Sequence, residues 1–167
     1  KYLMNELNSY FWLKNIFDEL NFNNLPHGII INGPQGIGKR VLAYQIASKL
    51  LLNKKTQMLD VDLFKSKNHP DFFILDNEKI LLRHITFRKA SKKEDWDENH
   101  GERNVNEFLT TTPSIAVNKV ALICNAQTMG KEPQNALLKS LEEPSQNSYI
   151  IITSDRSTAL YETIYSR

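Results

Sequence analysis

The sequence predicts an α/β fold in which a parallel β-sheet lies between two layers of helices. Four short apolar runs alternate along the 167 residues with segments of helical periodicity. Strands that alternate with helices at this spacing pair in parallel and need cover on both faces of the sheet. The composition, 41% hydrophobic and 24% charged, is typical of a globular domain and gives the chain enough apolar residues for one core.

The first half of the chain predicts a helix, a strand, a glycine-rich turn and a second helix. Apolar residues between 3 and 20 follow helical spacing, and turn-forming residues at 21–26 end that helix. The run at 27–32 (HGIIIN) fits a buried strand, because it is short and β-branched. Residues 33–38 form the glycine-rich turn, and a helix is expected from 39 to 52.

The second half predicts three more strands around a charged segment. Residues 53–68 are polar and predict a loop with at most one weak helical turn, whereas 72–75 (FFIL) predicts a buried strand. Residues 83–103, basic and then acidic, predict a solvated hairpin or loop. The remaining predicted elements are a short helix at 105–109, a strand at 119–124 (KVALIC), a helix at 133–142 that Pro144 ends, and a strand at 149–153 (YIIIT).

Composition excludes several classes of protein. The single cysteine, Cys124, excludes a disulfide framework and a four-cysteine zinc site. No run reaches the ~18–20 apolar residues that cross a bilayer, and no basic-then-apolar leader opens the chain, so a cytoplasmic protein without a membrane partner is expected. The net charge of +2 does not by itself indicate nucleic-acid binding.

Residues 33–40 (GPQGIGKR) match the phosphate-binding pattern G-x-x-x-x-G-K. Gly33, Gly36 and Gly38 would let backbone N–H groups surround a phosphate, and Lys39 would meet the outer phosphates at a helix N-terminus. Arg40 stands where Ser or Thr normally ligates Mg²⁺, and a guanidinium has no acceptor with which to hold a metal. The four residues are therefore candidate nucleotide-binding residues of a degenerate loop.

The third predicted strand ends in Cys124 and Asn125, where a phosphate-loop ATPase needs carboxylates. A thiol and an amide neither hold Mg²⁺ nor activate water at neutral pH. We expect no metal site, and whether the loop binds ATP stays open. An active phosphate-loop ATPase remains the alternative that Lys39 and the glycines favour.

Residues 135–144 (NALLKSLEEP) closely resemble the NALLKxLEEP signature of clamp-loader subunits of the AAA+ class. Further matches are the HPD segment at 69–71, Thr153 at the sensor position, and the final Tyr-Ser-Arg at 165–167, which is similar to the start of the Ser-Arg-Cys motif. Motor subunits of this family keep Ser or Thr after the loop lysine and an Asp-Glu pair after the third strand. This chain lacks both, and so resembles the delta-prime group of the bacterial DNA polymerase III clamp loader.

The resemblance implies a five-stranded AAA+ domain over residues 1–167, with all strands named above internal to the sheet and with lid and collar domains outside this chain. It implies a subunit that does not hydrolyse ATP, helps to load the sliding clamp on primed DNA, and supplies Arg167 as an arginine finger to a neighbouring ATPase. The implied partners are motor (tau/gamma) and delta subunits, with the clamp and primed DNA reached through the complex, while the chain alone is expected to be monomeric.

Two implications concern cofactors and other partners. The family's four-cysteine zinc module is missing, because 53–68 contains no cysteine, and no cofactor is expected. Direct nucleic-acid binding by the basic cluster at 83–93 and Trp96 is a third hypothesis. A solvated charged face explains that cluster better, because four acidic residues follow it and aromatic residues are not interleaved with it.

Overall fold

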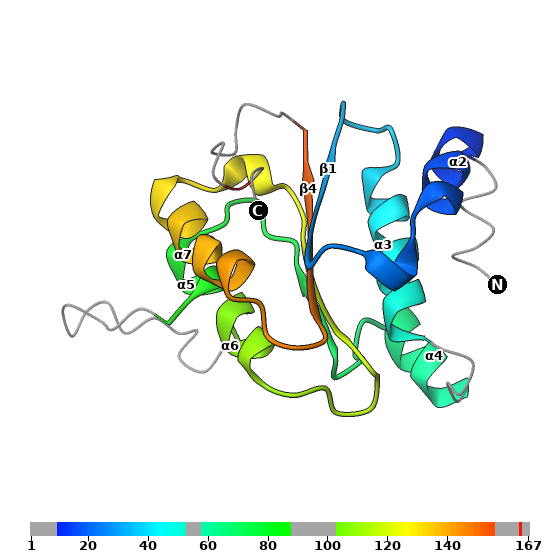
Figure 1. Cartoon of the computed structure of the whole chain (residues 1–167). Helices are drawn as coiled ribbons and strands as arrows, with labels where there is room; N and C mark the ends of the chain where they lie inside the picture. The colour runs from blue at the N-terminus through cyan, green and yellow to red at the C-terminus, as the bar shows by residue number, and fades with distance from the viewer. Residues whose placement is uncertain (1–9, 53–57, 88–102, 156–163, 165–167) are drawn as a thin grey trace.

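The computed structural model describes residues 10–52, 58–87, 103–155 and 164, and these form a parallel sheet between two layers of helices (Figure 1). The strand order is β1-β4-β3-β2, and each neighbouring pair is parallel. The predicted α/β class is therefore confirmed. The strands are β1 (Gly28–Asn32), β2 (Phe72–Leu75), β3 (Lys119–Ile123) and β4 (Ser148–Ser154).

The sheet formed by the described residues has four strands, so the expected fifth strand is not confirmed. Only β3 and β4 have a neighbour on both sides in this part of the chain, and β1 and β2 form the two edges. The expectation that every predicted strand is internal therefore does not hold for the described sheet. The long apolar runs reflect burial by helices on both faces, which an edge strand shares.

One face of the sheet is covered by α2 (Phe11–Glu19), α3 (Lys39–Leu51) and α4 (Met58–Lys65). Helix α3 lies directly on the sheet, and Ala43 and Ala47 are fully buried on it, so the helix can approach the strands closely. A short 3₁₀ turn, η1 (Phe22–Asn24), begins where the side chain of Asn21 accepts a hydrogen bond from the Asn23 N–H, 3.1 Å away.

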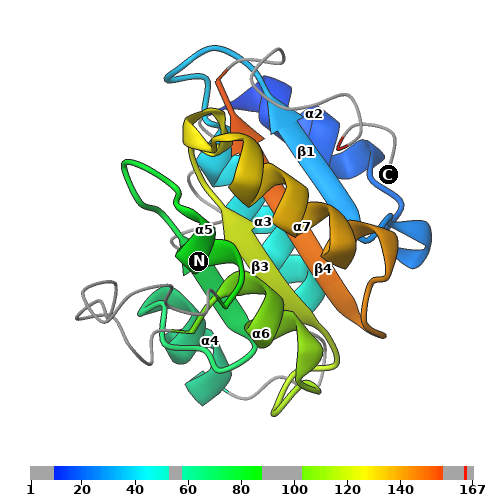
Figure 2. The ribbon, with the colours of Figure 1, turned by 90° about the vertical axis from the view of Figure 1, so that its left-hand side faces the viewer.

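The opposite face is covered by α5 (Leu82–Ile85), α6 (Val105–Thr110) and α7 (Lys131–Glu142), with the 3₁₀ turn η3 (Ala126–Thr128) after β3 (Figure 2). Leu137 and Leu141 of α7 are buried against the sheet. The packing is close enough that a Cβ atom at Gly28 would lie 2.9 Å from Leu141 Cδ2. Asn106 of α6 donates to the Ala136 carbonyl (3.1 Å) and joins the two helices.

Two predicted loops contain helices. The first is α4, within the polar stretch 53–68, and its Phe64 is 1% exposed and stacks on Phe72 with ring centroids 4.8 Å apart. The second is α5, in the charged segment, where Ile85 is completely buried. In each case one buried side chain outweighs weak periodicity, because tertiary packing stabilises a short helix that would not form alone. Residues 88–102 of that segment, and residues 1–9 of the first predicted helix, lie outside the described residues.

The loop before β3 is held by the buried carboxylate of Asp71, the last residue of the HPD segment. Its two oxygens accept hydrogen bonds from the backbone N–H groups of Ser114 (2.6 Å), Ile115 (2.8 Å) and Ala116 (2.8 Å). Asp71 is completely buried, so these bonds replace the water that its charge loses on folding. The motif residue therefore fixes a connection of the fold.

Two buried bases lie near this carboxylate. Burial lowers the pKa of His69, against the opposing charges of Asp71 and Asp60, and His69 Nδ1 accepts the Asp71 N–H at 3.1 Å. Burial also lowers the pKa of Lys119, although Asp71 acts to raise it. The Lys119 ammonium donates to Thr111 and lies 4.4 Å from the centroid of the Phe108 ring.

Among the described residues, no helix combines the length and the apolarity that crossing a membrane would require.

Candidate functional site: the phosphate loop

The glycine-rich loop joins the end of β1 to the first turn of α3, as the sequence predicts. Gly33 N–H donates to Ser154 O (3.3 Å), which ties the start of the loop to the end of β4. Gly36 and Gly38 have φ angles of 84° and 91°, a left-handed conformation in which residues with a Cβ are strained. These two candidate glycines are therefore required by the backbone of the loop.

Replacing Gly38 with alanine is expected to cost more stability than replacing Gly36. Both substitutions put a Cβ at positive φ, at about 1 kcal/mol each. At Gly38 the new Cβ would also lie 2.7 Å from Leu13 Cδ1, whereas nothing lies within 4 Å at Gly36. Leu13 would have to shift out of a buried position, which adds about another 1 kcal/mol. Urea unfolding of both variants measures the difference, and equal losses would contradict the packing of α2 on the loop.

The side chain of Lys39 is folded back onto its own loop. Its ammonium nitrogen lies 2.7 Å from each of three oxygens: the carbonyls of Gly33 and Pro34, and Oδ1 of Asp155. An ammonium group has three N–H donors, so all three are engaged. Lys39 is 8% exposed. A phosphate that accepted a hydrogen bond from this ammonium would have to displace at least one of these three oxygens.

Asp155 is held in place by a second residue, Gln127 of η3. The Gln127 amide donates to Asp155 Oδ2 (3.3 Å), and its carbonyl oxygen accepts the Asp155 N–H (3.2 Å). This two-way contact orients the carboxylate toward Lys39. The ion pair is therefore positioned by the tertiary structure on both sides.

Arg40, the residue in place of the metal-binding hydroxyl, forms an ion pair with Asp76 at the end of β2. Asn125, at the end of β3, also reaches this carboxylate, with its Nδ2 at 3.4 Å from Asp76 Oδ1. Asn125 is in the left-handed region at φ 56°, which asparagine tolerates better than most residues. A guanidinium and an amide thus take up the carboxylate that could otherwise ligate a cation here.

Asp76 and Asp155 belong to the candidate site through these ion pairs, although the sequence predicted no carboxylate near the loop. Each immediately follows a strand, β2 or β4. The carboxyl ends of parallel strands lie at one edge of the sheet, where ligands of α/β proteins bind. Their positions after predicted strands were the available signal. Both carboxylates are ion-paired with cations of the loop itself, Asp76 with Arg40 and Asp155 with Lys39.

The other predicted residues contribute less to this site. Cys124 is completely buried, and Thr153, the expected sensor residue, is 3% exposed within β4. Within the part of the chain that the structure describes, no group of three or more His, Cys, Asp or Glu residues could hold a metal ion. Arg167, the expected arginine finger, lies outside the described residues.

Comparisons with known proteins agree on one family. The family model described as "DNA polymerase III, delta subunit" matches residues 11–167. The chain is 33% identical over 147 residues to the DNA polymerase III subunit delta' of Pseudomonas aeruginosa, covering 84% of this chain and 41% of that protein. It is 27% identical over 172 residues to the subunit delta' of Buchnera aphidicola subsp. Baizongia pistaciae, covering 96% of this chain and 49% of that protein. The chain therefore spans less than half the length of these relatives.

The fold is also that of a solved structure. A DNA polymerase III gamma subunit-related protein of Thermotoga maritima matches with a TM-score of 0.61 at 22% identity, over 95% of this chain and 43% of that one. At this identity the likeness concerns the fold alone.

Proposed function

This chain belongs to the DNA polymerase III delta subunit family, and we propose that it serves in the clamp loader as a subunit that does not hydrolyse ATP. In this role it helps to load the sliding clamp on primed DNA, together with motor (tau/gamma) and delta subunits. It supplies Arg167 to the ATP of a neighbouring subunit.

The observation that carries this proposal is the Arg40–Asp76 ion pair. Catalysis of phosphoryl transfer needs Mg²⁺ held by a hydroxyl and a carboxylate. Here a permanent cation stands in place of the hydroxyl, and it pairs with the carboxylate of Asp76 at the end of β2. A divalent cation beside the Arg40 guanidinium would be repelled by its positive charge, and the carboxylate of Asp76 is already paired with that guanidinium.

The Lys39–Asp155 pair supports the same conclusion by a separate route. An active loop keeps its lysine available for the outer phosphates of the nucleotide. In this chain Asp155 occupies that lysine at 2.7 Å, and Gln127 holds Asp155. The loop has the backbone conformation of a phosphate loop, but the ammonium group of Lys39 stabilises the fold through its ion pair with Asp155.

A motor-type ATPase is the competing function. The G-x-x-x-x-G-K pattern, the left-handed glycines and the strand-loop-helix geometry favour it. The two functions differ in one measurable property, the turnover of ATP by the chain without other subunits.

We expect the purified chain to release no phosphate from ATP in the presence of Mg²⁺. Phosphate release is measured for the wild-type chain and for Lys39→Ala, which removes the lysine of the G-x-x-x-x-G-K pattern. Equal background rates are the expected result. Because Lys39 is buried, its replacement can disturb folding, so circular dichroism is used to check that each variant is folded. Arg40→Ala, which changes a half-exposed side chain of the same loop, is measured alongside. Steady turnover in the wild-type chain that Lys39→Ala abolishes would favour the motor-type ATPase.

A further inference from the structure

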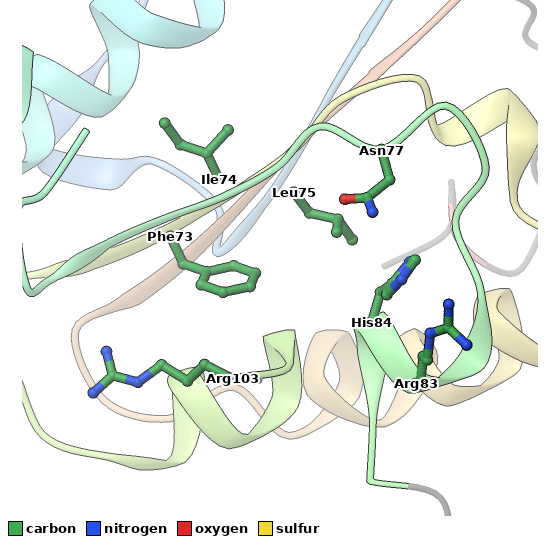
Figure 3. Close-up of a pocket in the computed structure, with 7 residues that line it drawn as sticks. All are labelled: Phe73, Ile74, Leu75, Asn77, Arg83, His84 and Arg103. Atoms are coloured by element: carbon green, nitrogen blue, oxygen red, sulfur yellow. The ribbon is translucent and has the colours of Figure 1, made fainter. Parts of the chain in front are cut away.

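A groove of about 300 Å³ lies beside β2, far from the phosphate loop in chain position and on the α5 and α6 side of the sheet (Figure 3). Phe73 and Leu75 of β2 point from the strand toward the helices and form its apolar floor. Phe73 is fixed there, since it stacks on Phe108 of α6 with centroids 5.4 Å apart. The groove is therefore supported by the packed core.

The groove follows an open edge of the sheet. In the part of the chain that the structure describes, β2 pairs only with β3. The carbonyls of Asp71 and Leu75 accept hydrogen bonds from the N–H groups of Val120 (3.0 Å) and Cys124 (2.8 Å), so odd-numbered residues of β2 face β3. In a parallel ladder alternate residues face opposite neighbours. The N–H and C=O of Ile74, which also lines the groove, therefore point to the open edge.

The ends of the groove are basic. Arg103 stands at one end, and Arg83 and His84 stand at the other (Figure 3). Among the residues that the structure describes, none of those that line the groove is a carboxylate. Arg103 is partly oriented already, because its guanidinium carbon lies 5.8 Å from the centroid of the Phe108 ring. A guanidinium has five donors, so each arginine can bind a carboxylate and keep a contact within the chain.

We propose that this groove binds an extended acidic peptide segment of a partner protein, which adds to the sheet at the edge of β2. The backbone of the peptide pairs with Ile74, an apolar side chain sits on Phe73 and Leu75, and flanking carboxylates meet Arg83 and Arg103. Single-stranded nucleic acid shares the negative charge, but its backbone lacks the alternating N–H and C=O groups that the strand edge complements. The peptide is therefore the better match.

The test uses a fluorescein-labelled peptide with the repeat Glu-Thr-Val-Thr, which puts glutamate and valine on the same face of an extended chain, and follows its anisotropy as the protein is added. Saturable binding is expected, and a peptide with glutamine in place of glutamate should bind at least roughly fivefold more weakly. Arg83→Gln and Arg103→Gln should each weaken binding of the glutamate peptide by a similar factor. Lys139→Gln, which removes an exposed cation from α7, is the matched control and should not change the affinity.

A second measurement locates the peptide. Binding should shift the NMR signal of the Ile74 amide and slow its exchange with solvent. Proline at the centre of the peptide removes an N–H donor and should abolish the effect. Urea midpoints of both arginine variants show whether they remain folded, and Arg103→Lys should bind better than Arg103→Gln.

Four outcomes would overturn the proposal. The first is no binding at about 1 mM peptide, and the second is binding that neither arginine variant weakens. The third is displacement of the peptide by oligo(dT), which would assign the groove to nucleic acid. The fourth is binding that is seen only after residues 88–102 are replaced by a Gly-Ser linker. The last result would make the chain's own acidic segment the occupant.

Discussion

Replacing Asp71 with alanine is expected to lower the free energy of unfolding by about 3 kcal/mol, more than the other substitutions considered for this fold. The variant loses a fully buried carboxylate and leaves the N–H groups of Ser114, Ile115 and Ala116 without their acceptor. The loop that leads into β3 would then have to move to regain hydrogen bonds from water. Urea unfolding followed by circular dichroism measures the loss.

Asp71→Asn separates charge from volume at the same position. Asparagine offers one oxygen where three N–H donors converge, and its NH₂ group would face at least one of them, so a loss of about 2 kcal/mol is expected. Asp62→Ala is the matched control, because its side chain is 61% exposed and its ion pair with Lys65 is long, at 3.8 Å. That control should cost less than about 0.5 kcal/mol. A loss below about 1 kcal/mol in Asp71→Ala would show that the loop does not depend on this carboxylate.

Stability should also fall when the pH drops below the ordinary pKa of histidine. The pKa of His69 is lowered in the folded state, so the unfolded chain binds its proton first as the pH falls. Above the unfolded pKa of about 6.5 the neutral imidazole is retained in both states and no stability is lost. Protonation would also turn Nδ1 from the acceptor of the Asp71 N–H into a donor. His69→Gln should flatten the pH dependence of the urea midpoint, and an unchanged slope would contradict this assignment.

Arg167→Ala is expected to reduce DNA-stimulated ATP turnover and clamp loading by about tenfold or more in a clamp-loader complex that contains this protein. This corresponds to about 1.4 kcal/mol of transition-state stabilisation. A guanidinium can contact the γ-phosphate of a neighbour's ATP through two parallel hydrogen bonds, and its charge is strengthened where the subunit interface excludes water. The prediction rests on the Tyr-Ser-Arg at 165–167 and on the family of the chain.

Two further variants make this result specific. Arg167→Lys keeps the charge but loses the planar fork, so only partial recovery of turnover is expected. Lys14→Ala removes an exposed cation of α2 and should leave turnover unchanged. Size-exclusion chromatography confirms that each complex assembles. Unchanged turnover in an intact Arg167→Ala complex would mean that this arginine does not act on a neighbour's nucleotide.

The sequence alone was sufficient for the class of fold and the position of the phosphate loop. Short β-branched runs such as 27–32 and 149–153 identify their strands to within a residue or two, because a buried strand leaves little freedom in composition. The loop was equally clear, since left-handed backbone at Gly36 and Gly38 restricts the residue type locally. Arg40 stands where the phosphate-loop pattern has Ser or Thr, so the absence of that hydroxyl was also visible in the sequence.

Only the tertiary structure decided which residues the two cations of the loop contact. Asp76 and Asp155 are far from the loop in sequence, and their pairing with Arg40 and Lys39 depends on the strand order that brings the ends of β2 and β4 to one edge. The helix α4 likewise depends on the packing of Phe64 against Phe72. Local patterns report the conformational preferences of neighbouring residues. Ion pairs and core contacts join residues that are distant in sequence, and only the folded chain brings them together.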